Sequence, residues 1–430
     1  MVLGKSIRRS NGHASSSSSI LDGDDTSSAS GGGMSIYYQK INQRVAVLEK
    51  VAVSVHESRA STREAALASL VGALEGFVPA HFIGWHLRGE IVRGCCASIK
   101  KGAAAKEARL ALRAVALLAV TLGPGSKRRI LPAETYNPLE PGPGSKKIMA
   151  ETFPLVSTDA PLVIAALESL AVVAFVDVAA ENMDDTEACM KALWGLIRPS
   201  TGPKVAGVAR KTSPHVLAAA VSAWTLVLTT TDGWKKKKAA ASSPAAWRDT
   251  AAHLASLLHS DSRAVRMAAG EALAVTIEMK LLTRDSNGAL ISGVAARASE
   301  LANEAAGAGV GKANFVEQKE LFNSITTFLA GGKAPASSVR ASSSHHGRLT
   351  ASTWTDIVRL NFLRRFLGGG FLPHLQGKVL MGEEAPLIGQ VFVVKEDDMA
   401  MDHKKKVEKQ RTLNRERSIV SDLKHGSSHV

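Results

Sequence analysis

The segment AGAGVGKAN, residues 306–314, is the stretch of this sequence closest to a phosphate-binding loop. Such a loop needs a glycine at its first position, so that the backbone can wrap the phosphates, and a hydroxyl after the lysine to ligand magnesium. Ala306 stands at the first position, and Ala313 stands where the hydroxyl should be. The sequence therefore predicts no nucleotide site here.

Histidines and cysteines, which could ligate a metal or act as nucleophiles, do not form a catalytic pattern either. His345 and His346 stand in a serine-rich stretch without a neighbouring cysteine or carboxylate. Cys95, Cys96 and Cys189 lack metal-ligand spacing, and three cysteines indicate small core residues in a reducing compartment. Because G-x-S-x-G, H-E-x-x-H and C-x-x-C are also missing, we expect no enzyme, no metal and no cofactor.

Aromatic and basic side chains do gather in a helix predicted over residues 354–367. Its apolar residues cover most of the helical wheel, so the helix must be covered by other parts of the protein or by a partner. Asn361, Arg364 and Arg365 share one strip, which would face solvent or an acidic partner. We predict that seven residues form a docking helix: Trp354, Arg359, Asn361, Phe362, Arg364, Arg365 and Phe366. The alternative is that this segment only caps the end of a repeat array.

Three glycines, Gly368, Gly369 and Gly370, follow this helix. Glycine ends a helix without steric cost because it adopts left-handed backbone angles. Three in a row exceed what such an end requires. They predict a turn at which another backbone approaches closely.

The net charge of +14 attracts acidic protein faces or phosphate backbones, or it only keeps the protein soluble. Part of the charge lies in a tail with these basic residues: Lys404, Lys405, Lys406, Lys409, Arg411, Arg415 and Arg417. The tail is a candidate second contact with a partner. A nuclear-localisation signal and a solvated tail are the alternatives.

The body of the chain reads as one helical pattern after another. Its 430 residues exceed a single core, and its apolar share is largely alanine with 5% aromatics, which suits close-packed helices. Helices are predicted over residues 61–74, 106–122, 160–178, 184–198, 213–231, 244–259, 261–280, 290–306 and 314–330. The first opens with a predicted capping box of Ser61 and Glu64.

Two internal echoes indicate a repeat. The pattern R-x-A-A-x-x-x-L begins at both Arg63 and Arg266, and a proline-led pattern begins at Pro161 and again at Pro214. A period near 50 slightly exceeds the roughly 40–47 residues of armadillo and HEAT repeats. A helix pair buries its apolar face only when another is stacked on it. We therefore predict an all-α, armadillo/HEAT-like helical solenoid with a small C-terminal helical domain and disordered tails.

Composition divides the chain into five segments. They are a disordered serine-rich N-terminus (1–33), an armadillo-like repeat domain (34–330), a linker (331–351), a C-terminal helical domain (352–394) and the basic tail (395–430). GPGSK occurs twice around residues 123–145, which we interpret as an insertion or a gene-model artefact. Glu168 and Asp177 interrupt the most apolar run, so we expect no membrane span.

The segment STWTDIVRLNFLRRFLGGGFLPHLQ, residues 352–376, resembles the C-terminal conserved region of interferon-related developmental regulator proteins of the plant type. STREAALASL (61–70), LAAAVSAWTLVLTTTDGW (217–234) and SRAVRMAAGEALAV (262–275) are similar to the armadillo-like domain of that family. The resemblance implies a non-enzymatic regulator. Relatives are described as transcriptional co-regulators that recruit proteins, and animal members also as ribosome-binding factors that hold ribosomes inactive.

Three functional hypotheses follow. The first is a scaffold of the co-regulator type that binds other proteins through its repeat surface and basic aromatic helix. A ribosome-binding translational regulator that contacts ribosomal RNA is the second. Direct DNA binding is the third, although no helix-turn-helix, zinc finger or basic zipper occurs. Each predicts a location in the nucleus, the cytoplasm or both, and none needs a membrane or a small-molecule substrate.

Overall fold

The computed structural model divides the chain into two compact units, Met1–Lys40 and Ile41–Val430. It describes residues 32–101, 105–123, 159–177, 183–198, 212–231, 244–307, 312–340, 347–381, 387–392 and 394–396. Of the smaller unit this includes only the start of helix α1 (Gly32–Ser54), whose first two residues fall within the N-terminus predicted to be disordered. The predicted insertion beyond residue 123 and the tail from residue 397 onward lie outside the described residues.

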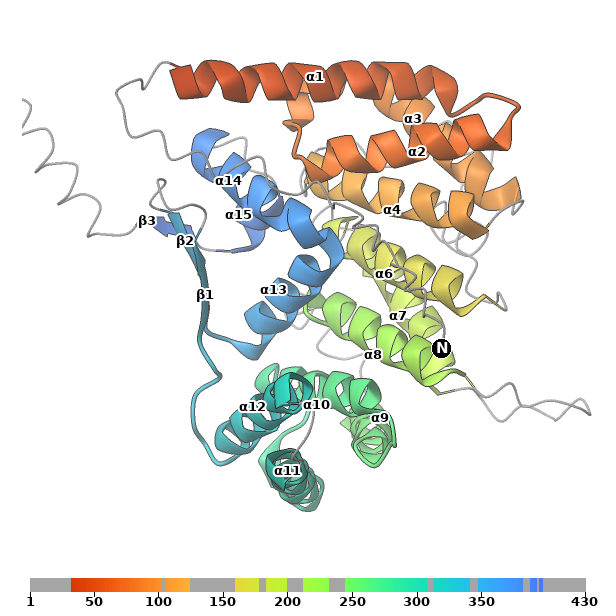
Figure 1. The fold of residues 1–430 in the computed structure, drawn as a ribbon. Coiled ribbons are helices and arrows are strands. Elements are labelled where there is room, and N and C mark those ends of the chain that lie inside the picture. Colours follow the sequence, from red (N-terminus) through yellow and green to blue (C-terminus); the bar gives the residue numbers. More distant parts are fainter. Residues whose placement is uncertain are drawn as a thin grey trace, which may run out of the picture. The chain divides into compact units, whose positions relative to one another are not determined.

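Six of the described helices pack side by side as an inner row in the larger unit (Figure 1). They are α2 (Ala60–Glu75), α4 (Ala105–Leu122), α6 (Ala160–Asp177), α8 (Pro214–Leu228), α10 (Arg263–Glu278) and α12 (Lys312–Leu329). Each contacts the next member of this row. The row is the core of the fold.

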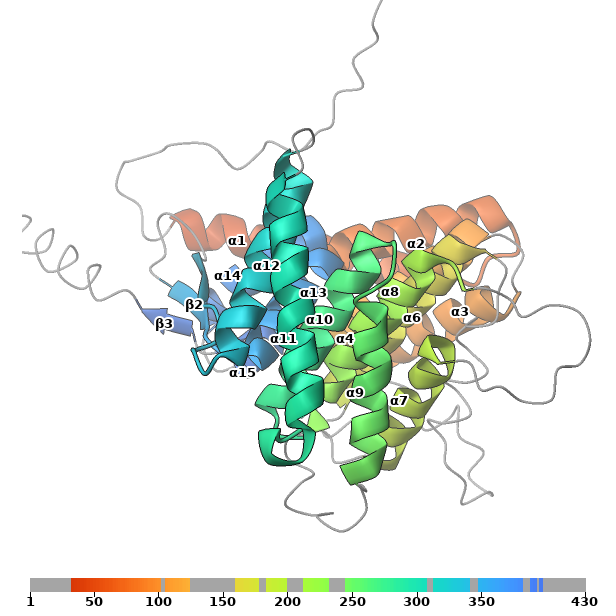
Figure 2. The same cartoon turned by 90° about the horizontal axis from the view of Figure 1, so that it is seen from below.

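Outer helices precede inner ones and pack against them. They are α3 (Trp85–Lys101), α7 (Met183–Ile197), α9 (Pro244–Leu257) and α11 (Arg284–Gly307), with a short 3-10 turn, η1 (Ala80–Phe82), before α3. Each packs on the inner helix that follows it, and Figure 2 shows the α9–α10 and α11–α12 pairs side by side. Stacked helix pairs are the architecture of an α-solenoid. The predicted all-α helical solenoid is confirmed.

The inner helices in the middle of the row are apolar on most sides because neighbours cover both flanks. In α4, for example, Ala111 and Ala114 are fully buried. Polar residues near the ends of these helices are satisfied within their own helix. The hydroxyls of Thr121, Thr225 and Thr276 each donate to the carbonyl four residues earlier, at 2.7–2.8 Å. The row therefore buries these threonines without leaving their hydroxyls unpaired.

The first sequence echo corresponds to a repeated contact, seen first at Arg63 of α2. Its Nη1 donates to the carbonyls of Glu57 and Ser58, at 3.0 and 2.6 Å, and so fixes the turn before the helix. Its Nε and Nη2 donate to the carboxylate of Glu107 on α4, at 2.7 and 3.0 Å. Both partners of this ion pair are buried.

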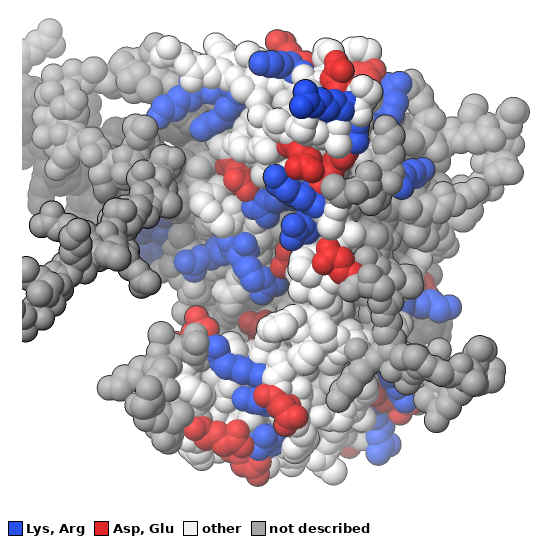
Figure 3. Space-filling model, turned by 45° about the vertical axis from the view of Figure 1, so that its right-hand side comes forward, with Lys and Arg blue, Asp and Glu red and all other residues white. Residues whose placement is uncertain are grey.

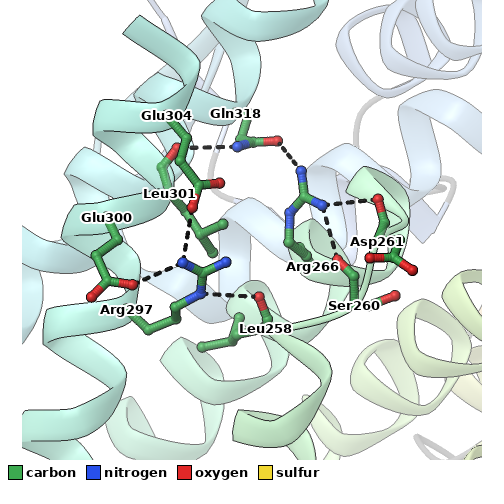
Figure 4. Close-up of polar contacts among 9 residues, drawn as sticks. All are labelled: Leu258, Ser260, Asp261, Arg266, Arg297, Glu300, Leu301, Glu304 and Gln318. Carbon is green, nitrogen blue, oxygen red and sulfur yellow. Dashed lines mark hydrogen bonds and ion pairs between the residues drawn. The ribbon is translucent and has the colours of Figure 1, made fainter. Parts of the chain in front are cut away.

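Arg266 of α10 makes the equivalent contacts (Figure 4). Its Nη1 donates to the carbonyls of Ser260 and Asp261, at 2.9 and 3.0 Å. Its Nη2 donates to Oε1 of Gln318 on α12, the next inner helix, at 3.1 Å. Like Arg63, it holds the preceding turn with one nitrogen and the neighbouring inner helix with another. The repeat inferred from the sequence is therefore also a repeat of contacts.

Helix starts agree only in part with the sequence. Pro161 and Pro214 of the second echo lie in the first turns of α6 and α8, two inner helices, as a true repeat requires. The predicted capping box is wrong, because α2 begins after Arg59 and no side chain caps it. Ser61 is thus inside the helix, and Glu64 pairs instead with a lysine of α4.

Residues 331–351 are not a structureless linker throughout. The strands β1 (Ser337–Arg340), β2 (Gly347–Ala351) and β3 (Val394–Glu396) form an antiparallel sheet in the order β1-β2-β3. Val339 pairs with Leu349, which also pairs with Val394 on its other side. The strands are too short and too polar to show an alternating pattern in the sequence. They are stabilised by pairing across the sheet.

The C-terminal helices pack against the inner row. They are α13 (Trp354–Leu367), the 3-10 turn η5 (Gly368–Gly370), α14 (Phe371–Met381) and α15 (Leu387–Val391). Helix α13 contacts α8 and α10, α14 contacts α2, and α15 contacts α4 (Figure 1). We call α13, η5 and α14 the crossing segment. It crosses several inner helices and does not merely cap the last repeat. It also belongs to the same compact unit as the helices it crosses. The predicted domain boundary between residues 330 and 352 therefore separates no packed units.

The three glycines place the crossing segment against α2. Gly368 has φ +56°, which L side chains rarely adopt. A Cβ at Gly370 would lie 2.8 Å from the carbonyl oxygen of Glu75 at the end of α2, whereas one at Gly369 would meet nothing within 4 Å. The predicted close approach of another backbone is found at Gly370.

These two neighbours allow a matched test. Gly370→Ala forces α14 away from α2, because the new methyl group would overlap the Glu75 backbone. We expect it to lower the free energy of unfolding by about 1–3 kcal/mol. Gly369→Ala should change it by less than about 0.5 kcal/mol. Urea unfolding of both variants measures the difference, and equal losses would contradict the packing.

Candidate interaction surface

The aromatic residues of the predicted docking helix are buried inside the protein. Trp354 is 0% exposed and its ring contacts Phe328 of α12, with ring centres 6.1 Å apart. Phe362 and Phe366 are each 3% exposed. The prediction that these three side chains are exposed anchors for a partner is therefore wrong, because the folded chain covers nearly all of their surface.

The start of α13 is fixed to α10 by a carboxylate. Glu278, the last residue of α10, accepts hydrogen bonds from the backbone N–H groups of Trp354 and Thr355, at 2.7 and 2.8 Å. It also accepts one from the Thr355 hydroxyl at 2.8 Å. The first N–H groups of a helix have no partner within the helix, and their positive end attracts a carboxylate. Glu278 supplies it.

Arg359 is engaged with α8 rather than exposed to a partner. Its Nη2 donates to the carbonyl of Thr229, just past α8, at 2.5 Å, and its Nε donates to the Thr229 hydroxyl at 3.1 Å. Its guanidinium carbon lies 5.8 Å from the ring centre of Phe175 on α6. A residue predicted as part of the docking surface is thus a contact within the chain.

Sequence reasoning missed His374 of α14. Its Nε2 donates to the carbonyl of Leu74 at the end of α2, at 2.9 Å, and its ring meets Phe77 edge to face. Burial lowers the pKa of His374 to about 4, aided by the nearby charge of Arg44 and opposed by the hydrogen bond to Leu74. The imidazole is therefore neutral at pH 7. The two partners are 300 residues apart, so no local pattern signals the contact.

The polar strip predicted on α13 is partly paired with acidic residues of the chain itself. Nε of Arg365 lies 3.7 Å from Glu168 of α6, and Asn361 donates to Glu271 of α10. Burial raises the pKa of both carboxyls, and the charge of Arg365 opposes this. Arg364 is exposed and makes no ion pair with another described residue. Of the seven predicted residues, Asn361, Arg364 and Arg365 remain accessible.

A pocket of about 230 Å³ lies between α4, α6 and α13, beside this strip. We call it the composite pocket. It is lined by Lys106, Arg109, Leu110, Arg113, Ala165, Glu168, Ser169 and Phe366. Arg113 is held in place, because it bonds to Glu75 and its guanidinium carbon lies 5.2 Å from the ring centre of Phe366. The sequence alone gave no sign of this pocket, since its wall comes from three distant segments.

Other predicted elements are placed or lie outside the described residues. Cys95 and Cys189 are buried, and burial raises the pKa of the Cys189 thiol to about 12, which suits inert core residues. The pair His345 and His346 and the basic tail from Lys404 to Arg417 lie outside the described residues. Within the described ranges, no group of three or more His, Cys, Asp or Glu could hold a metal ion.

No described helix is both long and apolar enough to cross a membrane. Comparison with protein families gives one match that covers most of the chain. A family model with the description Interferon-related developmental regulator (IFRD) matches residues 10–330. No curated protein matches the chain.

The buried histidine makes stability depend on pH. Because its pKa is about 4 in the folded chain and near 6.5 when exposed, the unfolded chain binds more protons between these values. Stability is fully present above pH 6.5 and falls as the pH drops to about 4, by on the order of 3 kcal/mol. His374→Gln should lose this part of the slope in thermal unfolding measured from pH 7 to pH 4. Identical slopes for both proteins would contradict a buried neutral His374.

Proposed function

This chain belongs to the interferon-related developmental regulator family, and we propose that it acts as a scaffold of the transcriptional co-regulator type, which binds other proteins. Membership in the family supports a regulatory, non-catalytic role. The finer proposal concerns what it binds. A stack of helix pairs presents a long surface, which suits contact with macromolecules.

The distribution of charge supports a protein partner. Several basic side chains on the described surface pair with carboxylates of the same chain: Lys106 with Glu64, Arg113 with Glu75, Arg263 with Glu317, and Arg297 with Glu300 and Glu304. Figure 3 shows positive and negative residues interspersed on one face. A nucleic-acid backbone is instead held by a field of one sign. This mixed surface is the observation that carries the proposal.

Ribosome binding is the second candidate, and the basic tail favours it. Seven basic residues between Lys404 and Arg417 could neutralise phosphates of ribosomal RNA. The same seven residues would support direct DNA binding. The experiments must therefore distinguish an effect on transcription from binding to ribosomes.

Tethering tests the proposal. The full chain is fused to an unrelated DNA-binding domain, and transcription of a reporter with the matching site is measured. We expect a several-fold change in transcription with the site and none without it, because recruitment of proteins and not DNA recognition is the activity. A change that persists without the site would instead favour direct DNA binding.

Sedimentation of cell extract is the companion measurement. The proposal expects the chain in the nuclear fraction and in the ribosome-free fraction. Changing the seven basic tail residues to Gln should alter this distribution little. An unchanged reporter together with tail-dependent co-sedimentation on ribosomes would overturn the co-regulator proposal in favour of the ribosome.

A further inference from the structure

The composite pocket joins an apolar floor to a basic rim. The floor consists of Leu110, Ala165 and the ring of Phe366. Its volume of about 230 Å³ is below the roughly 300–1,000 Å³ of small-molecule sites. The space therefore suits one large apolar side chain of a partner better than a cofactor.

The rim comes from one face of α4. Lys106, Arg109 and Arg113 stand at i, i+3 and i+7, and therefore run along about 10 Å of the helix. Arg113 is committed to Glu75, whereas Arg109 is exposed and makes no ion pair with another described residue. Lys106 is 67% exposed, and its 3.2 Å pair with Glu64 is of the weak surface kind that a partner's carboxylate can replace.

The negative charge of Glu168, the acidic residue of the pocket, already has basic neighbours in the chain. Glu168 lies 3.7 Å from Arg365, and the charges of Arg365 and Arg113 both act on it. Among the described residues that line the pocket, Lys106 and Arg109 can face an incoming anionic group.

We propose that the composite pocket docks an acidic segment of a partner protein, with one large apolar side chain on Leu110, Ala165 and Phe366 and its carboxylates on Lys106 and Arg109. The inference rests on the proposed function and names the partner's chemistry. Segments that alternate acidic and apolar residues have this character. Because Phe366 belongs to α13, the site is complete only while the crossing segment is docked.

A fluorescent peptide made only of alternating acidic residues and Phe or Leu is the probe. Its binding to the full chain is measured by polarisation. We expect at least tenfold weaker binding when its Phe and Leu are changed to Ser, and likewise when its acids are changed to Asn and Gln. Equal affinity for all three peptides would overturn the proposal.

Two variants of the chain test the site from both sides. Lys106→Glu with Arg109→Glu should weaken binding at least tenfold by reversing the rim. Ala165→Leu should do the same by filling the floor without a change in charge. Arg248→Glu, at another exposed position, on α9, controls for reversal of a surface charge away from the pocket and should change affinity less than twofold. If thermal unfolding shows that a reversed variant is unstable, Lys106→Gln with Arg109→Gln replaces it.

The outcomes separate this site from the broader function. Unchanged affinity in both pocket variants overturns the assignment of the site. The assignment is also overturned if a short RNA duplex binds more tightly than the peptide and the rim variants abolish that binding, because the rim is then a phosphate site. If the tethered chain alters the reporter but no peptide binds, only the pocket fails. If the peptide binds as expected and the reporter stays silent, only the co-regulator proposal fails.

Discussion

The carbonyl ends of the inner helices accept hydrogen bonds from the crossing segment, which supplies two side-chain donors. The last carbonyls of a helix have no partner within it. His374 donates to Leu74 at the end of α2, and Arg359 donates to Thr229 at the end of α8. In the opposite sense, Glu278 at the end of α10 accepts the first N–H groups of α13. The packing of the C-terminal helices thus depends on hydrogen bonds to the ends of α2, α8 and α10.

This arrangement changes the part that the C-terminal region plays. A helix that is apolar over most of its circumference must be covered, and α13 is covered by the repeat helices of its own chain. Its contribution to an interaction surface is therefore its polar edge and the small part of Phe366 that lines the composite pocket, not Trp354 or Phe362. The acidic partner that the sequence indicated for Asn361 and Arg365 is, in part, the chain's own Glu271 and Glu168.

Features that show as a local periodic pattern in the sequence could be predicted, and features that depend on contacts between distant segments could not. Most of the described helices, and the relation between Arg63 and Arg266, follow from apolar spacing and an internal echo, whereas α1 and α3 were not predicted. The wheel of residues 354–367 showed that the helix needs cover but not which surface provides it. The contacts of His374, the three-segment pocket and the short strand pairing join residues far apart in the chain. Ser61 failed as a cap because a helix boundary shifts by a residue or two without a change in pattern.

The most direct test of this account is hydrogen exchange of the full chain, followed segment by segment. If the crossing segment is part of the repeat body, the amides of α13 exchange as slowly as those of α8 and α10, because they open only when the unit unfolds. Amides of α13 that exchange fully within seconds while α8 stays protected would show that the segment is not docked. That result would contradict the central claim.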